Sequence, residues 1–294
     1  MSTTAEYDAF GPWIYEIHSE DEVPRLFRGQ GIDLASALLT VKVPREIERR
    51  VANPSMDLYD MVLSLGPESV TVLTRRGKAV DRREVRYPDI QGITDVVDLL
   101  RGRLVLHCEG NPVTVAYNAS STDVVAHVVQ VLREKYLTGT AAPRAGQTRV
   151  TIPSGVEDDL QNLYRRLARE DGGGRTLGVQ SKRVVTPVGA SGVGRAVARA
   201  WPTTMQSAVV VLEERELVVL HRDKPFATGH RPVQSLARTV LPLERLAAVD
   251  VRPSQTYEGI GALQLRVGRV THEFYLEASN ARAVAQAIEP VLPA

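Results

Sequence analysis

Short segments in which apolar and polar residues alternate fill most of the chain, and Gly, Pro, Asn and Asp separate them. A two-residue period of this kind is typical of half-buried β-strands. Hairpin turns at 213–216 and around Gly268 favour an antiparallel meander. The pattern predicts seven strands in each half of the chain: 36–43, 60–65, 69–75, 79–87, 92–98, 103–108 and 112–118 in the first, and 177–186, 208–213, 216–221, 237–243, 247–253, 261–267 and 270–276 in the second.

A helix is predicted to close each half. Apolar residues between 124 and 136, and again between 281 and 291, recur at the spacing of a buried helical stripe. Thr122-Asp123 and Ser279-Asn280 stand where the N-caps are expected. Such a helix must bury its stripe, and the open end of a curved sheet is the available place.

Each half also begins with elements of its own. Residues 13–17 suit a strand, and Ser19 followed by three acidic residues suits the start of a helix. In the second half, Ser154 precedes a helix predicted over 156–169, and the glycines 172–174 end it.

The two halves share one pattern and are interpreted as two copies of one unit. Residues 104–132 align without gaps with 263–291, so that Ala119-Ser120 falls on Ala278-Ser279. The alternative is a chance resemblance between ordinary strands and helices. Three more blocks match in the same order: 70–75 with 217–222, 85–93 with 241–249 within a residue or two, and 21–28 with 158–165. We therefore expect two domains, 1–138 and 148–294, joined by a linker at 139–147 that is rich in small residues, Gly and Pro.

Six or seven antiparallel strands followed by one amphipathic helix resemble the pleckstrin-homology (PH) fold, and more narrowly the PH-like domains of bacteria. The second half carries the pattern in 217–220, 241–250 and the hairpin 263–276, and the first half repeats its middle as 87–93. The resemblance implies an α+β, mainly β fold of two PH-like antiparallel barrels or half-barrels, each closed by a C-terminal amphipathic helix. It also implies binding or scaffolding rather than catalysis, and bacterial members often self-associate. The leading strand and helix of each copy depart from a minimal PH unit.

The composition of the chain limits the classes of partner and the compartment that can be expected. The 294 residues are enough for two cores, and 36 Lys+Arg against 35 Asp+Glu give a net charge of +1, which disfavours a nucleic-acid binder. The single cysteine, Cys108, excludes an intramolecular disulfide. Neither a signal peptide nor an apolar run of membrane-spanning length is visible, so we expect a cytoplasmic protein without a transmembrane segment.

Basic residues gather after an early strand in each half and are the candidate contact residues. Phosphate groups require several converging cationic donors, and in eukaryotic PH domains a loop at this place binds phosphoinositide head groups. The alternatives are an acidic protein partner, and a solvated hairpin edge whose charges prevent edge pairing. The candidates are Arg75, Arg76, Lys78, Arg82 and Arg83 in the first half and Arg222, Lys224 and Arg231 in the second.

No motif indicates catalysis. The six histidines are scattered without metal-ligand spacing, no G-x-S-x-G elbow occurs, and the glycines of 189–194 match neither a phosphate loop nor a dinucleotide fingerprint. We therefore expect no cofactor, no metal site and no enzymatic activity. The sequence predicts a non-catalytic interaction or scaffold module whose partner is another protein or a second copy. The alternatives are a peripheral binder of anionic lipid or phosphate groups and, third, an enzyme of unknown type.

Overall fold

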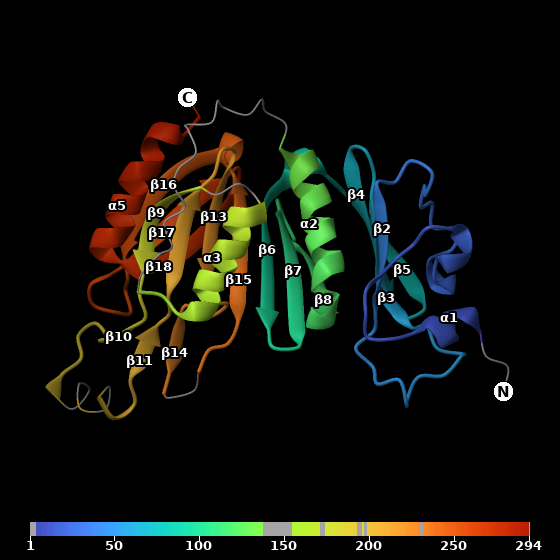
Figure 1. Cartoon of the computed structure of the whole chain (residues 1–294), viewed down its shortest axis with the longest axis horizontal. Coiled ribbons are helices and arrows are strands. Elements are labelled where there is room, and N and C mark those ends of the chain that lie inside the picture. The colour runs from blue at the N-terminus through green and yellow to red at the C-terminus, as the bar shows by residue number, and fades with distance from the viewer. Residues whose placement is uncertain are drawn as a thin grey trace. The chain divides into compact units, whose positions relative to one another are not determined.

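The structure is a computed structural model that describes residues 4–137, 155–170, 174–192, 196, 199–229 and 232–293. The chain divides into two compact units, Met1–Ile90 with Leu99–Thr138 and Gln91–Asp98 with Gly139–Ala294. Antiparallel sheets dominate both units (Figure 1), which confirms the expected α+β, mainly β class. Within the described ranges no sheet closes into a barrel. The expected linker at 139–147 lies outside these ranges.

A five-stranded antiparallel sheet forms the centre of the first unit. Its order is β1 (Tyr15–Glu16), β2 (Leu39–Pro44), β3 (Tyr59–Leu65), β4 (Ser69–Arg76) and β5 (Ala79–Arg86). The short helix α1 (Ala5–Ala9) precedes the sheet. The hairpin β7 (Arg101–Cys108) with β8 (Val113–Asn118) and the helix α2 (Thr122–Tyr136) follow it.

The N-terminal segment covers one face of this sheet, where Phe10 and Phe27 are buried against Val62 and Leu73. The helix expected after Ser19 is wrong: the chain forms two short 3-10 turns, Glu20–Glu22 and Arg25–Phe27. Pro24 explains the break, because proline disfavours helical backbone in the residue before it and supplies no amide hydrogen.

Two sheets and two helices form the main body of the second unit. The first sheet has the order β6 (Ile90–Asp98), β15 (Leu236–Pro242), β13 (Glu216–His221), β12 (Ala208–Leu212) and β9 (Arg175–Gln180). The second contains β16 (Leu246–Pro253), β17 (Ile260–Val267) and β18 (Val270–Glu277). Helix α3 (Asp158–Glu170) crosses in front of β13 and β15, and α5 (Ala278–Ile288) lies beside β16–β18 (Figure 1).

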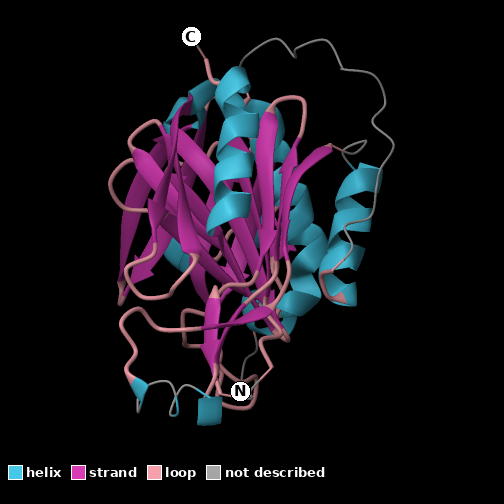
Figure 2. Ribbon diagram, turned by 90° about the vertical axis from the view of Figure 1, so that its left-hand side faces the viewer, coloured by secondary structure: helices cyan, strands magenta, loops and turns pink. Residues whose placement is uncertain are grey.

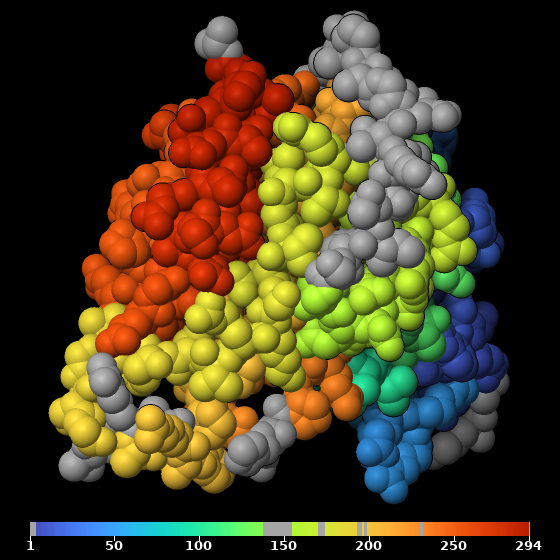
Figure 3. All heavy atoms as spheres, turned by 60° about the vertical axis from the view of Figure 1, so that its left-hand side comes forward, coloured from blue at the N-terminus to red at the C-terminus, as the bar shows by residue number. Residues whose placement is uncertain are grey.

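Both faces of the first sheet are buried. Alternate residues of β12 and β13 face opposite sides, so that Val210 and Val219 join the core under β17 and α5, whereas Val211 and Val218 contact α3. This explains why residues 208–212 and 217–220 are apolar without alternation. The helices lie outside the sheets (Figure 2), and α5 forms a continuous part of the surface with the strands before it (Figure 3).

A third, smaller sheet of the second unit is not anticipated by the sequence pattern. It contains β10 (Arg183–Val185), β11 (Thr203–Met205) and β14 (Phe226–Thr228). The pattern over 177–186 predicts one strand, but the structure ends β9 at Gln180 and begins β10 at Arg183.

The same order of elements occurs in both halves of the chain. Four strands, a 3-10 turn, three strands and a helix follow one another as β2–β5, Tyr87–Asp89, β6–β8 and α2. The second half repeats them as β9, β12, β13 and β15, then Leu243–Arg245, β16–β18 and α5, with β10 and β11 inserted after β9 and β14 inserted after β13. The match of 21–28 with 158–165 does not extend to structure, since only the second segment is helical.

The closing helices lie where the sequence predicts them, but neither expected cap is the N-cap, which is Ser121 for α2 and Glu277 for α5. Helix α5 begins at Ala278, and the Asn280 side chain donates a hydrogen bond to the Val179 carbonyl over 2.8 Å instead of capping the helix. Among the described residues, no helix is long and apolar enough to cross a membrane.

Strand β6 belongs to the first half by the sequence repeat but to the second compact unit by its contacts. By its order in the chain, β6 is the first strand after the 3-10 turn of the first copy, as β16 is in the second. Its residues 91–98 nevertheless belong to the second unit, where they pair antiparallel with β15. In this pairing, Ile93 is opposite Val240, Thr94 is opposite Thr239 and Asp95 is opposite Arg238.

Candidate functional site

The tip of the β4–β5 hairpin carries two of the predicted contact residues. Arg76 pairs with Ala79 across a two-residue turn, in which Gly77 adopts a φ of 66° that favours glycine. Arg76 and Lys78 are exposed and have no hydrogen-bond or ion-pair partner among the residues that the structure describes.

The other three predicted contact residues of this hairpin are bound within the first unit. Arg75 forms an ion pair with Asp60, with its Nη2 atom 2.6 Å from Oδ1. Arg82 donates to the carbonyl oxygens of residues 30 and 31, and Arg83 donates to the Asn111 carbonyl over 2.5 Å. Strand alternation places Arg82 and Arg83 on opposite faces of β5. The five residues therefore do not converge on one point.

In the second unit, Arg222 is a buried structural residue rather than a surface cation. Its side chain is 3% exposed, and its two terminal nitrogens donate to Asp159 over 2.8 and 2.9 Å. It also donates to the Ser235 carbonyl. Burial opposes ionisation of Asp159, but the hydrogen bonds and charge of Arg222 outweigh it and keep the pKa of this carboxyl below its ordinary value. The pair fixes the start of α3 to the end of β13. Lys224 is exposed, and Arg231 lies outside the described residues.

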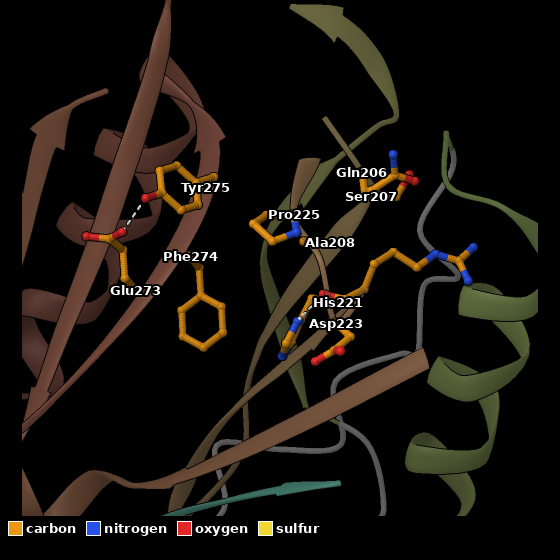
Figure 4. Close-up of a pocket in the computed structure, with 10 residues that line it drawn as sticks. Gln206, Ser207, Ala208, His221, Asp223, Pro225, Glu273, Phe274 and Tyr275 are labelled. Carbon is orange, nitrogen blue, oxygen red and sulfur yellow. Dashed lines mark hydrogen bonds between the residues drawn. The ribbon is translucent and has the colours of Figure 1, made fainter. Parts of the chain in front are cut away.

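A cavity of about 80 Å³ lies beside Arg222, between the ends of β12 and β13 and strand β18. Glu273, Phe274 and Tyr275 line one side, and His221 and Asp223 line the other (Figure 4). The Tyr275 hydroxyl donates to Glu273, which occupies the polar groups on that side.

Both ring nitrogens of His221 have partners. Its Nδ1 atom lies 2.8 Å from the Arg222 carbonyl oxygen, which only accepts, so Nδ1 carries the proton. Its Nε2 atom then accepts from the Thr239 hydroxyl at 2.9 Å, and this hydroxyl lies 2.9 Å from that of Thr94. Burial lowers the pKa of His221, so the ring is neutral. With both nitrogens engaged, His221 is a poor general base.

Two further polar side chains of this cavity are buried. Gln206 is 4% exposed and Ser207 is 1% exposed, and their side-chain oxygens have no hydrogen-bond partner among the described residues. The volume accommodates about two or three water molecules. The sequence gives no signal for this cavity, because its residues come from three separate strands and their loops. In the described part of the chain, no group of three His, Cys, Asp or Glu residues is placed to hold a metal ion.

Several strands lie at sheet edges, among them the eight-residue strands β5, β16 and β18. Strand β5 pairs only with β4, and β16 pairs only with β17, as far as the structure describes the chain. The backbone N–H and C=O groups along such an edge are available to another strand. Mixed charges follow both edges, with Asp81 and Arg83 on β5 and Asp250 and Arg252 on β16.

No protein-family model matches this chain, and no curated protein matches it at a significant level of similarity. Its function is therefore inferred from the geometry of these surfaces.

Proposed function

We propose that this protein is a non-catalytic interaction module of two PH-like domains, which binds protein partners by adding a strand to its sheets. The observation that carries the proposal is that, within the described ranges, β5 and β16 are long strands with one unpaired edge. An extended segment that lies along such an edge gains a ladder of main-chain hydrogen bonds, and flanking side chains select the partner. The repeated order of four strands, a turn, three strands and a helix supports the PH-like assignment.

The charges of β5 give this edge selectivity. Residues 81–84 are Asp, Arg, Arg and Glu, so each face of the strand carries one acidic and one basic residue here. A partner with the complementary sequence of charges is attracted, whereas one with like charges directly opposite is rejected. The mixed signs favour a specific protein strand over a uniformly acidic surface.

The proposal is tested by affinity capture with three immobilised proteins. These are the wild type, an edge variant with Asp81→Arg and Arg83→Asp, and a control variant with Arg76→Ala and Lys78→Ala. A partner that binds the edge is retained by the wild type and the control variant and lost by the edge variant. Hydrogen exchange of the β5 amides must slow when that partner is added. Captured proteins that bind all three equally, with no protection of β5, would refute the proposal.

A second candidate function is the binding of anionic groups by the hairpin tip. The exposed, unpartnered side chains of Arg76 and Lys78 favour it. Each basic residue near an anionic membrane contributes about 1 kcal/mol, so two give weak binding that salt abolishes. Sedimentation with phosphatidylserine vesicles at low salt, and with inorganic phosphate as competitor, tests it. The Arg76→Ala and Lys78→Ala variant must lose all binding.

A further inference from the structure

The pairing of β6 with β15 joins a strand of the first copy to a strand of the second. The repeat supplies the counterparts of both strands. When Tyr87–Asp89 is aligned with Leu243–Arg245, β16 is the counterpart of β6 and β5 is the counterpart of β15. Both counterparts lie at the edge of their sheets, and in the described part of the chain their outer edges have no neighbouring strand. Each half therefore carries one edge of a pairing that the chain makes once.

The observed register can be transferred to the two free edges. Thr94 lies opposite Thr239 in the observed pairing, and Val96 lies opposite Ala237. The same alignment places Asp250 at the position of Thr94 and Arg83 at that of Thr239. It places Arg252 at the position of Val96 and Asp81 at that of Ala237.

We infer that copies of this chain assemble head to tail, with β5 of one copy paired antiparallel to β16 of the next, Arg83 opposite Asp250 and Asp81 opposite Arg252. The inference rests on the proposed strand-edge function and identifies the partner as a second copy. Two opposite charges then face each other at two neighbouring positions of the same sheet face.

The charges also exclude neighbouring registers. A slip by one residue would turn each side chain to the other face of the sheet. A slip by two residues would place Arg83 opposite Arg252, or in the other direction Asp81 opposite Asp250. Like charges directly opposite each other are destabilising. Among these registers, only the transferred one pairs both charges.

The proposed pairing would replace hydrogen bonds that two of these side chains now form, because Arg83 donates to the Asn111 carbonyl and Asp250 accepts from the Val251 amide. Asp81, Asp250 and Arg252 are exposed and Arg83 is partly exposed. Asp250 and Arg252 form a surface ion pair of 3.2 Å on their own strand, which contributes little because both side chains are solvated. Pro253 would lie opposite residue 80, at the end of the ladder, where a missing amide hydrogen is tolerated.

The contact is heterologous, because the two copies use different surfaces. Such contacts produce closed rings or open filaments rather than a two-fold dimer. Each internal copy would contribute both edges. The assembly would repeat the order of the halves found in one chain.

Charge reversal tests the register directly. The first variant carries Asp81→Arg and Arg83→Asp, and the second carries Asp250→Arg and Arg252→Asp. Each variant keeps the net charge of the chain. The matched control swaps the ion pair of Glu48 and Arg50, which has the same spacing and lies outside the strands.

Sedimentation velocity over a series of micromolar concentrations provides the readout. We expect the wild type and the control to assemble, and each reversed variant alone to associate at least about tenfold more weakly. An equimolar mixture of the two reversed variants must assemble again, because each then supplies the edge that matches the other. This recovery also shows that both variants are folded.

Three results would overturn the inference: a monomeric wild type, a reversed variant that assembles like the wild type, or a mixture that fails to recover while circular dichroism shows folded chains. A chain with Asp81→Cys mixed with one carrying Arg252→Cys gives a second readout. This pair must form a disulfide-linked dimer faster than Asp81→Cys with Asp250→Cys, since only the first positions are directly opposite. If the wild type is monomeric but captures another protein through β5, the proposed function stands and this inference fails.

Discussion

The ion pair of Arg222 and Asp159 offers a sharp test of how α3 is attached to its sheet. The guanidinium is 3% exposed and the carboxylate is 45% exposed. The Asp159→Asn substitution removes the nearer countercharge and leaves the buried guanidinium with Glu157, whose Oε1 atom lies 3.9 Å away. Breaking a fully buried pair in this way costs about 3–5 kcal/mol. Because solvent reaches half of this carboxylate, we expect a loss of about 2–3 kcal/mol in the free energy of unfolding.

The Arg222→Met substitution should be much milder, since it removes the buried charge and keeps the apolar stem. Replacement of a buried ion pair by apolar groups is often neutral, so we expect a change below about 1 kcal/mol. In the Arg222→Met background, Asp159→Asn should then cost less than about 1 kcal/mol. The difference between the two costs is the coupling energy of the pair.

The pH dependence gives an independent check. The pKa of Asp159 is lowered in the folded protein, so the unfolded chain binds the proton first as pH falls. The stability from this pair is present above the unfolded pKa of about 3.9 and is lost as pH falls through the folded value. The Asp159→Asn variant should lack this loss of stability at low pH, because its amide side chain does not titrate.

Urea denaturation of the second unit is the assay. Trp13 and Trp201 are the only tryptophans, so a Trp13→Phe background leaves Trp201 as the reporter of the second unit. If Asp159→Asn unfolds like the wild type, or costs as much without Arg222 as with it, the pair does not hold α3 as described.

Three further predictions concern buried groups in both units. Burial and the charge of Arg103 lower the pKa of His107 to about 4. Its proton NMR titration should therefore have a midpoint near pH 4, and the free energy of unfolding should fall as pH drops from about 6.5 towards 4. A midpoint near 6.5 would contradict this. Gly102→Ala should destabilise the first unit by about 1–3 kcal/mol in thermal unfolding, because a Cβ atom there would lie 2.1 Å from the Tyr117 ring; an unchanged midpoint would show that the ring moves freely. Leu160→Ala should lower the free energy of unfolding of the second unit by about 2–5 kcal/mol in urea, since Leu160 is fully buried between α3 and the sheet. A change below about 1 kcal/mol would mean that α3 is not part of that core.

Sequence periodicity located the strands well because most of them have one buried and one solvated face. Each of the fourteen expected segments overlaps a strand, although 177–186 covers two, and the closing helices begin within a residue or two of the expected positions. The prediction of a helix after Ser19 is wrong because it rests on acidic residues that are typical of a first turn. Pro24 disfavours helical backbone at this place, and the chain forms two 3-10 turns instead. The small sheet of β10, β11 and β14 was missed because strands of three residues carry too short a pattern.

The candidate site was harder to predict than the fold. The sequence shows that Arg75, Arg82 and Arg222 are basic, but not that each is bound to a carboxylate or carbonyl nearby. Long-range partners such as Asp159 for Arg222 depend on tertiary packing, which a local pattern does not encode. The sequence also does not show that β5 and β16 lie at sheet edges. This depends on the order of strands within the sheets, which is known only once β6 is seen to pair with β15.

The position of β6 also bears on how the polypeptide tolerates being cut. Residues 91–98 lie in the sheet of the second unit although the chain around them belongs to the first. After cleavage between 139 and 147, β6 would belong to one fragment and its pairing partner β15 to the other. A fragment ending at residue 138 would display β6 without β15, and it should be poorly soluble unless the complementary fragment is co-expressed.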